Sequence, residues 1–467
     1  MESNRTDAPL PADMLPSLRD DIVSGALPNG TPLREEAVAA RFGVSRTPAR
    51  MAIHCLIREG VLDRETHHSA VVHTLTRTEV TDLTEMHECL DLIAVRQAAV
   101  RRSEADLRRL RADVMAAGRA EAAVDPLAVM RAGGEFRRHT YHATGNRPLC
   151  NVEGAFRTRT RRLIALSEAQ AVSPAQSFRR LLAAFEARDS EAAESVMADL
   201  LKRIRRTRPE HVLPRMDEDI ADTLSAPTVP SAPEPSVASE PSPADVLRVV
   251  SLLREQIIDG TRAPGERLGT RRVAAELGVS RAVAVDALEL LRREGLVTTA
   301  TARSAARVHV PCLEESDDLL DVVATMTTRA ARIAVQRPAT EEYRRLHDIL
   351  TQEKVAWLNN DSALIEHMFA FRRHILAMAD NKAFLEADEL LNGRLRLQFA
   401  TIAFEPLVLR GHQLLYGAIS ARDPALAEKI HRETLGRIDR RGRLLQTDGG
   451  PLRPAVSEIP GPPASRG

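Results

Sequence analysis

Two arginines four residues apart, Arg46 and Arg50, lie in the segment SRTPAR and would leave the same face of a helix. Ser45 is placed to cap this helix, and Pro48 falls in its first turn, where a missing N–H group does no harm. Each guanidinium group could donate two parallel hydrogen bonds to O6 and N7 of a guanine, worth about 1–3 kcal/mol of discrimination per good pair. Thr47 lies beside them. The spacing therefore predicts a surface that reads bases.

The residues around this segment predict a helix-turn-helix followed by a wing. EEAVAARF at 35–42 predicts a short helix, and Gly43 with Val44 supplies a tight turn before the second helix. The second helix of such a motif enters the major groove of DNA with its N-terminal end. The segment 60–75 reads as two short β-strands and predicts a wing. Its tip would bring three side chains near the phosphates: Arg64, His67 and His68.

The chain contains the same unit twice. Residues 18–33 align with residues 253–268, and the offset of 235 also carries GVSR at 43–46 onto 278–281 and FRRH at 136–139 onto 371–374. A constant offset over such a distance indicates a duplication with almost no net insertion. In each copy a DNA-reading part of about 60 residues precedes a part whose apolar residues recur with helical period, which predicts a helical bundle.

These patterns predict the domain boundaries. A stretch rich in Pro, Ala and Ser separates the copies and cannot bury a core, and the tail is rich in Pro and Gly. We expect a first winged-helix domain at 11–76, a first helical domain at 78–206, a linker at 207–243, a second winged-helix domain at 244–311, a second helical domain at 312–441 and a disordered tail at 442–467.

The stretch LRDDIVSGALPNGTPLREEAVAARFGVSRTPARMAIHCLIREGVL resembles the winged-helix domain of GntR-family bacterial transcription regulators. The helical parts resemble the ligand-sensing FCD domain of the FadR-like branch. The resemblance implies a mainly α protein with two winged helix-turn-helix domains, each with a small β wing, and two all-α FCD-like bundles in one chain. It also implies a regulator, expected to be a repressor, that binds double-stranded operator DNA and a small acidic metabolite. The recognition residues of the family correspond to Arg46, Thr47 and Arg50.

The second copy departs from this pattern. Ser280 and Arg281 are retained, but Thr47, Pro48 and Arg50 are replaced by Ala282, Val283 and Val285. Losing one guanidinium fork removes about 1–3 kcal/mol of base discrimination. Two interpretations stay open: this domain positions the protein on phosphates, or it has become structural. Candidates for phosphate contacts in its wing are Arg303 and Arg307.

The family resemblance implies a metal site formed by an Asp and a His at i and i+4 with two further His residues, and this chain lacks most of those ligands. Aligned on the FRRH segments, the four positions hold Gly133, Arg137, Phe178 and Asp199 in the first copy, and Met368, Arg372, His412 and Glu433 in the second. We therefore expect no metal cofactor.

Arg137 and Arg372 put the same positive charge at one ligand position in both copies. An arginine can hold a carboxylate directly through two parallel hydrogen bonds, which predicts a metal-free pocket for a small carboxylate or other anionic effector. The accompanying candidates are His139, His374 and His412. The alternative left open is that these arginines lie on a solvated face or pair with a nearby acidic residue. His87 on the first bundle helix either lines a pocket or is a partly buried structural histidine.

The composition limits the other functions. Basic and acidic residues balance at 65 each, so an attraction to DNA must come from a local field. The sequence has no run of apolar residues that would span a membrane and no signal-peptide pattern, which predicts a cytoplasmic protein. No P-loop, GxGxxG, HExxH or nucleophile–base spacing occurs, so an enzyme is disfavoured.

Two copies joined by a linker predict a pseudo-dimer within one chain, with a homodimer as a further possibility. Linked domains meet at an effective concentration of about millimolar. We expect an asymmetric operator with one half-site read strongly and the other weakly. The other function left open is a metabolite-binding or protein-docking module that descends from such a regulator and no longer reads DNA.

Overall fold

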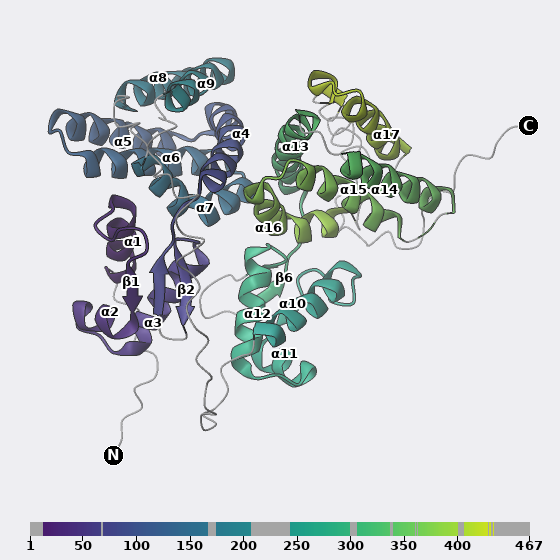
Figure 1. The fold of residues 1–467 in the computed structure, drawn as a ribbon, viewed down its shortest axis with the longest axis horizontal. Coiled ribbons are helices and arrows are strands. Elements are labelled where there is room, and N and C mark those ends of the chain that lie inside the picture. The colour runs from purple at the N-terminus through teal and green to yellow at the C-terminus, as the bar shows by residue number, and fades with distance from the viewer. Residues whose placement is uncertain are drawn as a thin grey trace, which may run out of the picture. The chain divides into compact units, whose positions relative to one another are not determined.

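The computed structural model describes residues 13–66, 69–166, 174–206, 243–298, 306–336, 340–359, 361, 363–399, 406–427, 429–430 and 433. The chain divides into two compact units. The first comprises residues 1–145 and 152–225, and the second comprises residues 146–151 and 226–467. Each unit pairs a small head with a larger helical bundle (Figure 1). The predicted linker apart from Pro243, and the predicted tail, lie outside the described residues.

The first head is a winged helix. Two helices flank a turn at Gly43, whose φ of 63° is the left-handed conformation that a helix C-terminus needs. The three strands form an antiparallel sheet in the order β1-β3-β2. The elements are α1 (Met14–Ser24), β1 (Pro32–Arg34), α2 (Glu35–Phe42), α3 (Arg46–Arg58), β2 (Leu62–Thr66) and β3 (Ser69–Val72).

The second head repeats this order with shorter strands. Its turn glycine, Gly278, has a φ of 64°, and its sheet has the order β4-β6-β5. The two heads each bury one apolar cluster between their helices and sheet. The elements are α10 (Pro243–Ile258), β4 (Arg267–Leu268), α11 (Thr270–Leu277), α12 (Arg281–Arg293), β5 (Val297–Thr298) and β6 (Ala306–Val308).

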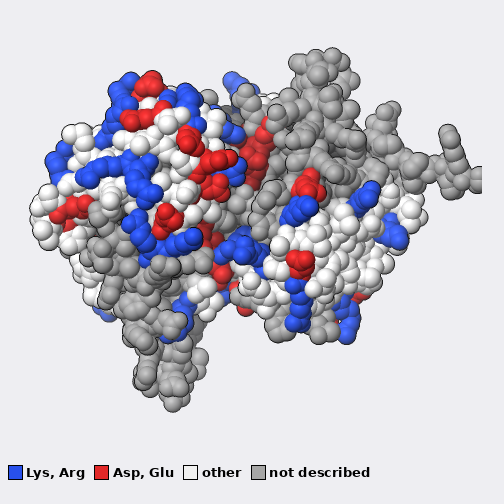
Figure 2. Space-filling model, turned by 90° about the horizontal axis from the view of Figure 1, so that it is seen from above, with Lys and Arg blue, Asp and Glu red and all other residues white. Residues whose placement is uncertain are grey.

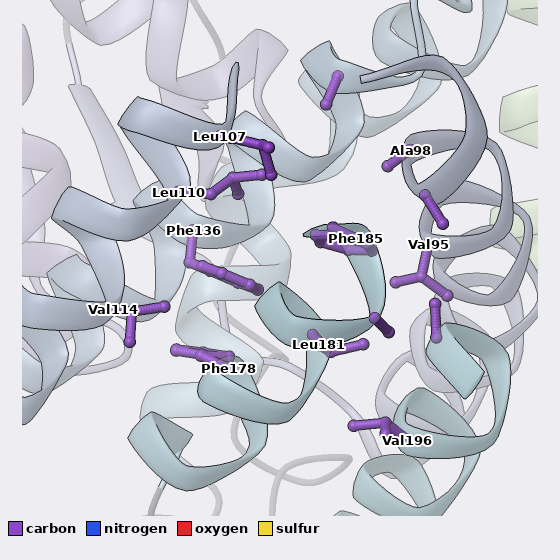
Figure 3. Close-up of a cluster of buried hydrophobic side chains, with 14 of the residues drawn as sticks. Val95, Ala98, Leu107, Leu110, Val114, Phe136, Phe178, Leu181, Phe185 and Val196 are labelled. Carbon is purple, nitrogen blue, oxygen red and sulfur yellow. The ribbon is translucent and has the colours of Figure 1, made fainter. Parts of the chain in front are cut away.

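Both bundles are all-helical over their described residues. In the first bundle, α4 and α5 begin with capping boxes, in which Thr76 pairs with Glu79 and Ser103 with Asp106. Its core contains Phe136, Phe178, Leu181 and Phe185 (Figure 3). The helices are α4 (Arg77–Arg101), α5 (Glu104–Ala122), α6 (Pro126–Ala143), α7 (Arg147–Leu166), α8 (Pro174–Ala187) and α9 (Ser190–Arg206).

The second bundle follows the same course. Asn381 accepts a hydrogen bond from Phe384 N at the start of α16, as Asn146 does from Leu149 N at the start of α7. These two caps are 235 residues apart, so the duplication extends to local detail. The helices are α13 (Leu313–Gln336), α14 (Thr340–Leu358), α15 (Leu364–Met378), α16 (Lys382–Phe399) and α17 (Pro406–Ser420). The fold is mainly helical with two small three-stranded sheets, which confirms the predicted fold class.

Charges of both signs are mixed on the face of the molecule that Figure 2 shows. Figure 2 shows Lys and Arg interspersed with Asp and Glu on one face of the molecule. A chain with no net charge and mixed surface charges attracts DNA only where particular side chains leave a local positive field.

Candidate functional site

The first turn of α3 presents the predicted reading residues to solvent. Arg46 and Thr47 are exposed, Pro48 and Ala49 are buried, and Arg50 is half-buried. This pattern arises because α3 packs its apolar stripe against α2 and leaves the opposite face outside. The structure therefore brings Arg46, Thr47 and Arg50 to one end of one exposed helix face.

Ser45 is the N-cap residue of the helix that begins at Arg46, as expected, and only its side-chain hydrogen bond is missing. Ser45 has the extended backbone of an N-cap residue, but its side chain makes no capping hydrogen bond. Ser280 in the second head does cap, because its hydroxyl accepts a hydrogen bond from Val283 N at 3.3 Å. In the first head the residue at the position of Val283 is Pro48, which has no N–H group to donate.

Carboxylates of α2 hold both arginines of the first head. Arg50 donates from Nε to Glu35 Oε1 at 2.9 Å and from Nη2 to Glu35 Oε2 at 3.2 Å, and the Glu35 side chain is only 6% exposed. Arg46 Nη2 lies 2.6 Å from Glu36 Oε1, and both of these side chains are 69% exposed. Since a guanidinium group has five donors, the buried pair orients Arg50, whereas the exposed pair with Glu36 is weak and easily exchanged.

The second head exposes the equivalent positions with different chemistry. Arg281 and Ala282 are exposed, Val283 and Ala284 are buried, and Val285 is 47% exposed. Positions 281–284 have the same burial as positions 46–49, so the changes from Thr47 to Ala282 and from Arg50 to Val285 fall on the exposed face, whereas Val283, which replaces Pro48, is buried.

The wings are described in part. Arg64 lies on β2 and is exposed, as a phosphate contact requires. Arg307 lies on β6, where Nη1 donates to the Gly265 carbonyl oxygen at 2.9 Å. The three other wing candidates, His67, His68 and Arg303, lie outside the described residues.

In the first bundle Arg137 pairs with a buried carboxylate. Arg137 Nε donates to Asp91 Oδ1 at 3.0 Å, and Nη2 donates to the Tyr141 hydroxyl at 3.0 Å. The Tyr141 hydroxyl in turn donates to Asp91 Oδ1 at 2.7 Å. Burial opposes the charge, yet the Asp91 carboxylate raises the pKa of Arg137 above its ordinary value. This is the alternative that the sequence left open, with an aspartate as the acidic partner.

His139 and His87 also have internal partners. His139 Nδ1 lies 2.5 Å from Asp113 Oδ2, and its Nε2 lies 2.7 Å from Arg138 Nη2. His87 is buried, with Nδ1 2.7 Å from the Leu83 carbonyl oxygen and Nε2 2.5 Å from the Thr160 hydroxyl. Both contacts of His87 are those of a structural histidine.

The second bundle contains a cavity that Arg372 and His412 both line. The cavity is partly open and has a volume of about 60 Å³, room for about four water molecules. Its walls are otherwise largely apolar and include Val323, Met368, Ile375, Leu395, Phe399 and Leu415. Two of the predicted effector residues therefore meet in one site.

Each of these two side chains also has a carboxylate partner. Arg372 Nη1 forms an ion pair with Asp388, while Arg372 Nε is buried without a hydrogen-bond partner among the described residues. His412 Nδ1 lies 2.9 Å from both carboxylate oxygens of Glu353, which is fully buried. Asp388 and Glu353 were not singled out from the sequence, because no spacing links them to the FRRH segment.

His374 does not belong to this site. Its Nε2 lies 2.9 Å from the Glu342 carbonyl oxygen and 3.3 Å from Glu342 Oε2. Its three-residue separation from Phe371 on α15 does not bring it to the cavity wall.

The predicted alignment of Phe178 with His412 agrees with the ring contacts. Phe178 stacks on Phe136 with ring centroids 4.2 Å apart, and His412 stacks on Phe371 with centroids 4.3 Å apart. Figure 3 shows Phe178 facing Phe136 inside the first bundle. A Cβ atom on Gly133 would lie 3.7 Å from Phe178 Cζ, so Phe178 fills space beside this glycine.

Neither bundle offers a metal site among the residues that the structure describes. No group of three or more His, Cys, Asp or Glu side chains is placed to hold an ion there. The family resemblance implies a metal-binding histidine at the position that Arg137 and Arg372 occupy here. Their positive charges would repel a cation.

One helix of each bundle docks on the head of the same unit. Arg159 of α7 lies over Gly60, and Arg394 of α16 lies over Gly295, at the turn that follows the recognition helix. The remaining contacts differ in polarity. Arg162 of α7 is 2% exposed and donates to Asn29, whereas Leu397 of α16 is part of the apolar core of the second head.

Two protein-family models match this chain, one at both heads and the other at both bundles. The model of bacterial regulatory proteins of the gntR family matches residues 15–72 and 246–307, and the model of the FCD domain matches residues 82–203 and 318–437. No described helix is long and apolar enough to cross a membrane.

Several relatives match parts of the chain. A probable D-xylose utilization operon transcriptional repressor of Paenarthrobacter nicotinovorans is 28% identical over 179 residues, which are 38% of this chain and 79% of that protein. The gluconate operon transcriptional repressor of Bacillus subtilis is 38% identical over 74 residues, 16% of this chain and 30% of that protein. The solved structure of E. coli McbR/YncC is 22% identical with a TM-score of 0.38, over 43% of this chain and 97% of that one.

The two family matches together cover the heads and bundles of both copies. The family consists of DNA-binding transcription regulators rather than enzymes, and its FCD domains bind effectors. The chain therefore belongs to the GntR family of bacterial regulatory proteins and carries the winged helix-turn-helix domain and the FCD domain twice.

Proposed function

We propose that this regulator represses transcription, reads its operator mainly through the first head and senses a small anionic metabolite through the second bundle. The observation that carries the proposal is the cavity shared by Arg372 and His412. Repression is inferred from relatives that are named as repressors, among them the two described above. A protein that occupies a promoter excludes other proteins from it, and an effector that weakens the complex would restore transcription.

The chemistry of the cavity favours a short carboxylate with an apolar part. Arg372 has a buried Nε that lacks a hydrogen-bond partner among the described residues, and a carboxylate oxygen would satisfy it. The apolar walls would bury a hydrocarbon segment, at about 0.8 kcal/mol for each CH₂ group. The volume accommodates a few heavy atoms.

The contacts in the first bundle favour a structural role for Arg137. Asp91 and Tyr141 already use its Nε and Nη2 donors. An anion would have to displace Asp91, whose burial would make an unpaired charge costly. We therefore assign effector binding to Arg372 and His412, and the roles predicted for Arg137, His139 and His374 stay predictions.

Calorimetric titration with a series of two- to six-carbon carboxylates tests the sensing site. We expect Arg372→Gln to lose binding by about tenfold or more, because one charge-assisted bidentate contact is lost. Arg137→Gln is the matched control at the equivalent position and should bind as the wild type does. Binding that survives Arg372→Gln but not Arg137→Gln would move the site to the first bundle.

The proposed division of labour on DNA has its own test. Selection of bound duplexes from a random pool should give an asymmetric site with a guanine-containing half bound by the first head. Arg46→Ala should relax that half-site. Selection of no preferred sequence by the wild type would refute DNA reading by this chain.

The tandem arrangement leads to a further proposal, a single-chain pseudo-dimer. The linker makes the pairing of the copies intramolecular, which removes the need for a second chain. Light scattering should then give the mass of one chain for the free protein, and the mass of one chain plus one duplex for the complex with the operator. An obligate homodimer with paired first heads would contradict this arrangement.

A further inference from the structure

The second head carries a small apolar patch on the face that would meet DNA. Val285 is 47% exposed and Ala282 is exposed, and their separation of three residues places them side by side on α12. The equivalent positions of the first head hold Arg50 and Thr47. Loss of base reading would require only the replacement of Arg50, whereas here both positions hold apolar side chains.

The charges around this patch differ from those of the first head. Arg271 takes the position of Glu36, so the carboxylate that binds Arg46 in the first head is replaced by a second guanidinium group near Arg281. Neither Arg271 nor Arg281 has an ion-pair partner among the residues that the structure describes, and both are exposed. The patch is therefore flanked by positive charge that can meet phosphates.

Asp286 borders the patch at the position of Met51 and is exposed. A carboxylate accepts hydrogen bonds from the amino groups of adenine or cytosine and is repelled by O6 and N7 of guanine, which are both acceptors. This side chain disfavours the base that the first head is equipped to read.

We propose that the second head reads thymine: Val285 and Ala282 contact C5-methyl groups in the major groove while Arg271 and Arg281 hold the flanking phosphates. The methyl group of thymine is the one apolar group that a base edge presents in the major groove, and small apolar side chains recognise it by contact. The inference rests on the proposed function, because it requires that the chain reads DNA. It makes the operator chemically asymmetric, with a guanine-containing half and a thymine-containing half.

Replacing thymine by uracil isolates this contact, because uracil lacks only the methyl group. Full-length protein is titrated against the selected operator in which deoxyuridine replaces thymidine in one half-site at a time. We expect each contacted methyl group in the second half-site to be worth about fourfold in affinity, the factor for burying one such group. Uracil in the guanine-containing half should leave the affinity unchanged.

Substitutions at Val285 complete the test. Val285→Ser should weaken binding to the thymine operator and remove the sensitivity to uracil, and Val285→Arg should select guanine at the contacted position. Both changes fall on an exposed side chain, so folding should be preserved. Val355→Ser, which changes a valine that is 50% exposed in the second bundle, is the matched control and should bind as the wild type does.

The outcomes separate the inference from the proposed function. A wild-type preference for one guanine-containing half-site, with no thymine preference beside it, would overturn the inference and leave DNA reading by the first head intact. Equal affinity for thymine and uracil operators would do the same, and the patch would then fit a protein partner better than DNA. Absence of any sequence preference would refute the proposed function itself.

Discussion

His412 stacks on Phe371 with ring centroids 4.3 Å apart and planes inclined by 22°, while its Nδ1 lies 2.9 Å from both carboxylate oxygens of Glu353. The first bundle has the same stack made of two phenylalanines, Phe136 and Phe178. The difference between Phe178 and His412 leaves this stack apolar in the first bundle and puts a polar side chain in the cavity wall of the second. The imidazole also satisfies a carboxylate that is fully buried.

A phenylalanine in place of His412 should destabilise the second bundle. His412→Phe keeps the stack but leaves Glu353 buried without this partner, which should lower the free energy of unfolding by about 3 kcal/mol. Trp357 is the single tryptophan and packs in the same bundle, so its fluorescence follows urea unfolding there.

A second substitution separates charge from packing. His412→Phe combined with Glu353→Leu removes both polar partners and should recover most of the lost stability. If His412→Phe alone unfolds at the urea concentration of the wild type, the pair with Glu353 does not stabilise the bundle.

Much of the fold could be predicted because it depends on local patterns. The GVSR turns identify the two heads, and the helical periods identify the two bundles. The constant offset, which also relates the two FRRH segments, identifies the duplication. The turn glycines Gly43 and Gly278 have the left-handed conformation that their positions predict. The reading residues follow from spacing within one helix, and Arg46 and Arg50 do leave one face of α3.

The partners of these residues could not be predicted in the same way. Arg137 binds Asp91, which lies 46 residues earlier on another helix, and His412 binds Glu353, which lies 59 residues earlier. Such pairs depend on how helices pack, and several acidic residues on each facing helix would fit the pattern equally well. The missing capping hydrogen bond of Ser45 follows from Pro48, which lacks the N–H group that Val283 supplies in the second head.

The junction between the first head and α4 should be most stable in mildly acidic solution. His73 Nδ1 lies 2.8 Å from Asp63 Oδ2 and its Nε2 lies 3.0 Å from Glu79 Oε1, and the hydrogen bond to Glu79 raises the pKa of His73 above 6.5. The pKa of Glu79 is lowered to about 2: burial opposes this shift, and the bonds to His73 and Thr76 outweigh it.

The signs of these shifts define the pH window. The contribution of His73 is complete below pH 6.5 and is lost as the pH rises through its raised pKa, while that of Glu79 is present above pH 4.5 and is lost as the pH falls toward 2. His73→Asn should therefore reduce local stability by about 1 kcal/mol near pH 5.5 and have a smaller effect above pH 8. Arg162 also faces the carboxylates of Asp63 and Glu79. It is unchanged in His73→Asn, so it does not contribute to the difference between the variant and the wild type.

Hydrogen exchange at the start of α4, corrected for intrinsic rates, measures this junction. The difference between wild type and His73→Asn should shrink as the pH rises from 5.5 to 8. A difference that grows with pH would show that the charged imidazole does not stabilise the junction.

Substitutions at two equivalent positions of the head–bundle contacts, Leu397 and Arg162, should differ in their effect on the stability of the heads. Leu397→Ala removes an apolar side chain, 4% exposed, from the core of the second head and should cost about 3 kcal/mol. Arg162→Leu copies the second unit into the first, where burial lowers the pKa of the arginine and its Nη1 has no hydrogen-bond partner among the described residues. That change should be neutral or stabilising by about 1 kcal/mol or more.

Hydrogen exchange in the two heads checks both substitutions. Protection should fall in α10 and α12 for Leu397→Ala and stay the same or rise in α1 and α3 for Arg162→Leu. Loss of protection with Arg162→Leu would mean that the buried guanidinium group stabilises the first head despite its incomplete hydrogen bonding.

The two carboxylates beside the recognition arginines should affect DNA binding in opposite directions. Glu35 is 6% exposed and holds Arg50 through two hydrogen bonds, so Glu35→Gln should misplace Arg50 and weaken operator binding by about tenfold. Glu36 is 69% exposed and competes with DNA for Arg46, so Glu36→Gln should strengthen binding, by at most about fivefold because an exposed pair is worth less than 1 kcal/mol. Titration of the selected operator with each variant measures both effects, with Arg281→Ala as a comparison that leaves the first head unchanged. Equal effects of Glu35→Gln and Glu36→Gln would mean that both carboxylates act only through their negative charge and that burial of Glu35 does not position Arg50.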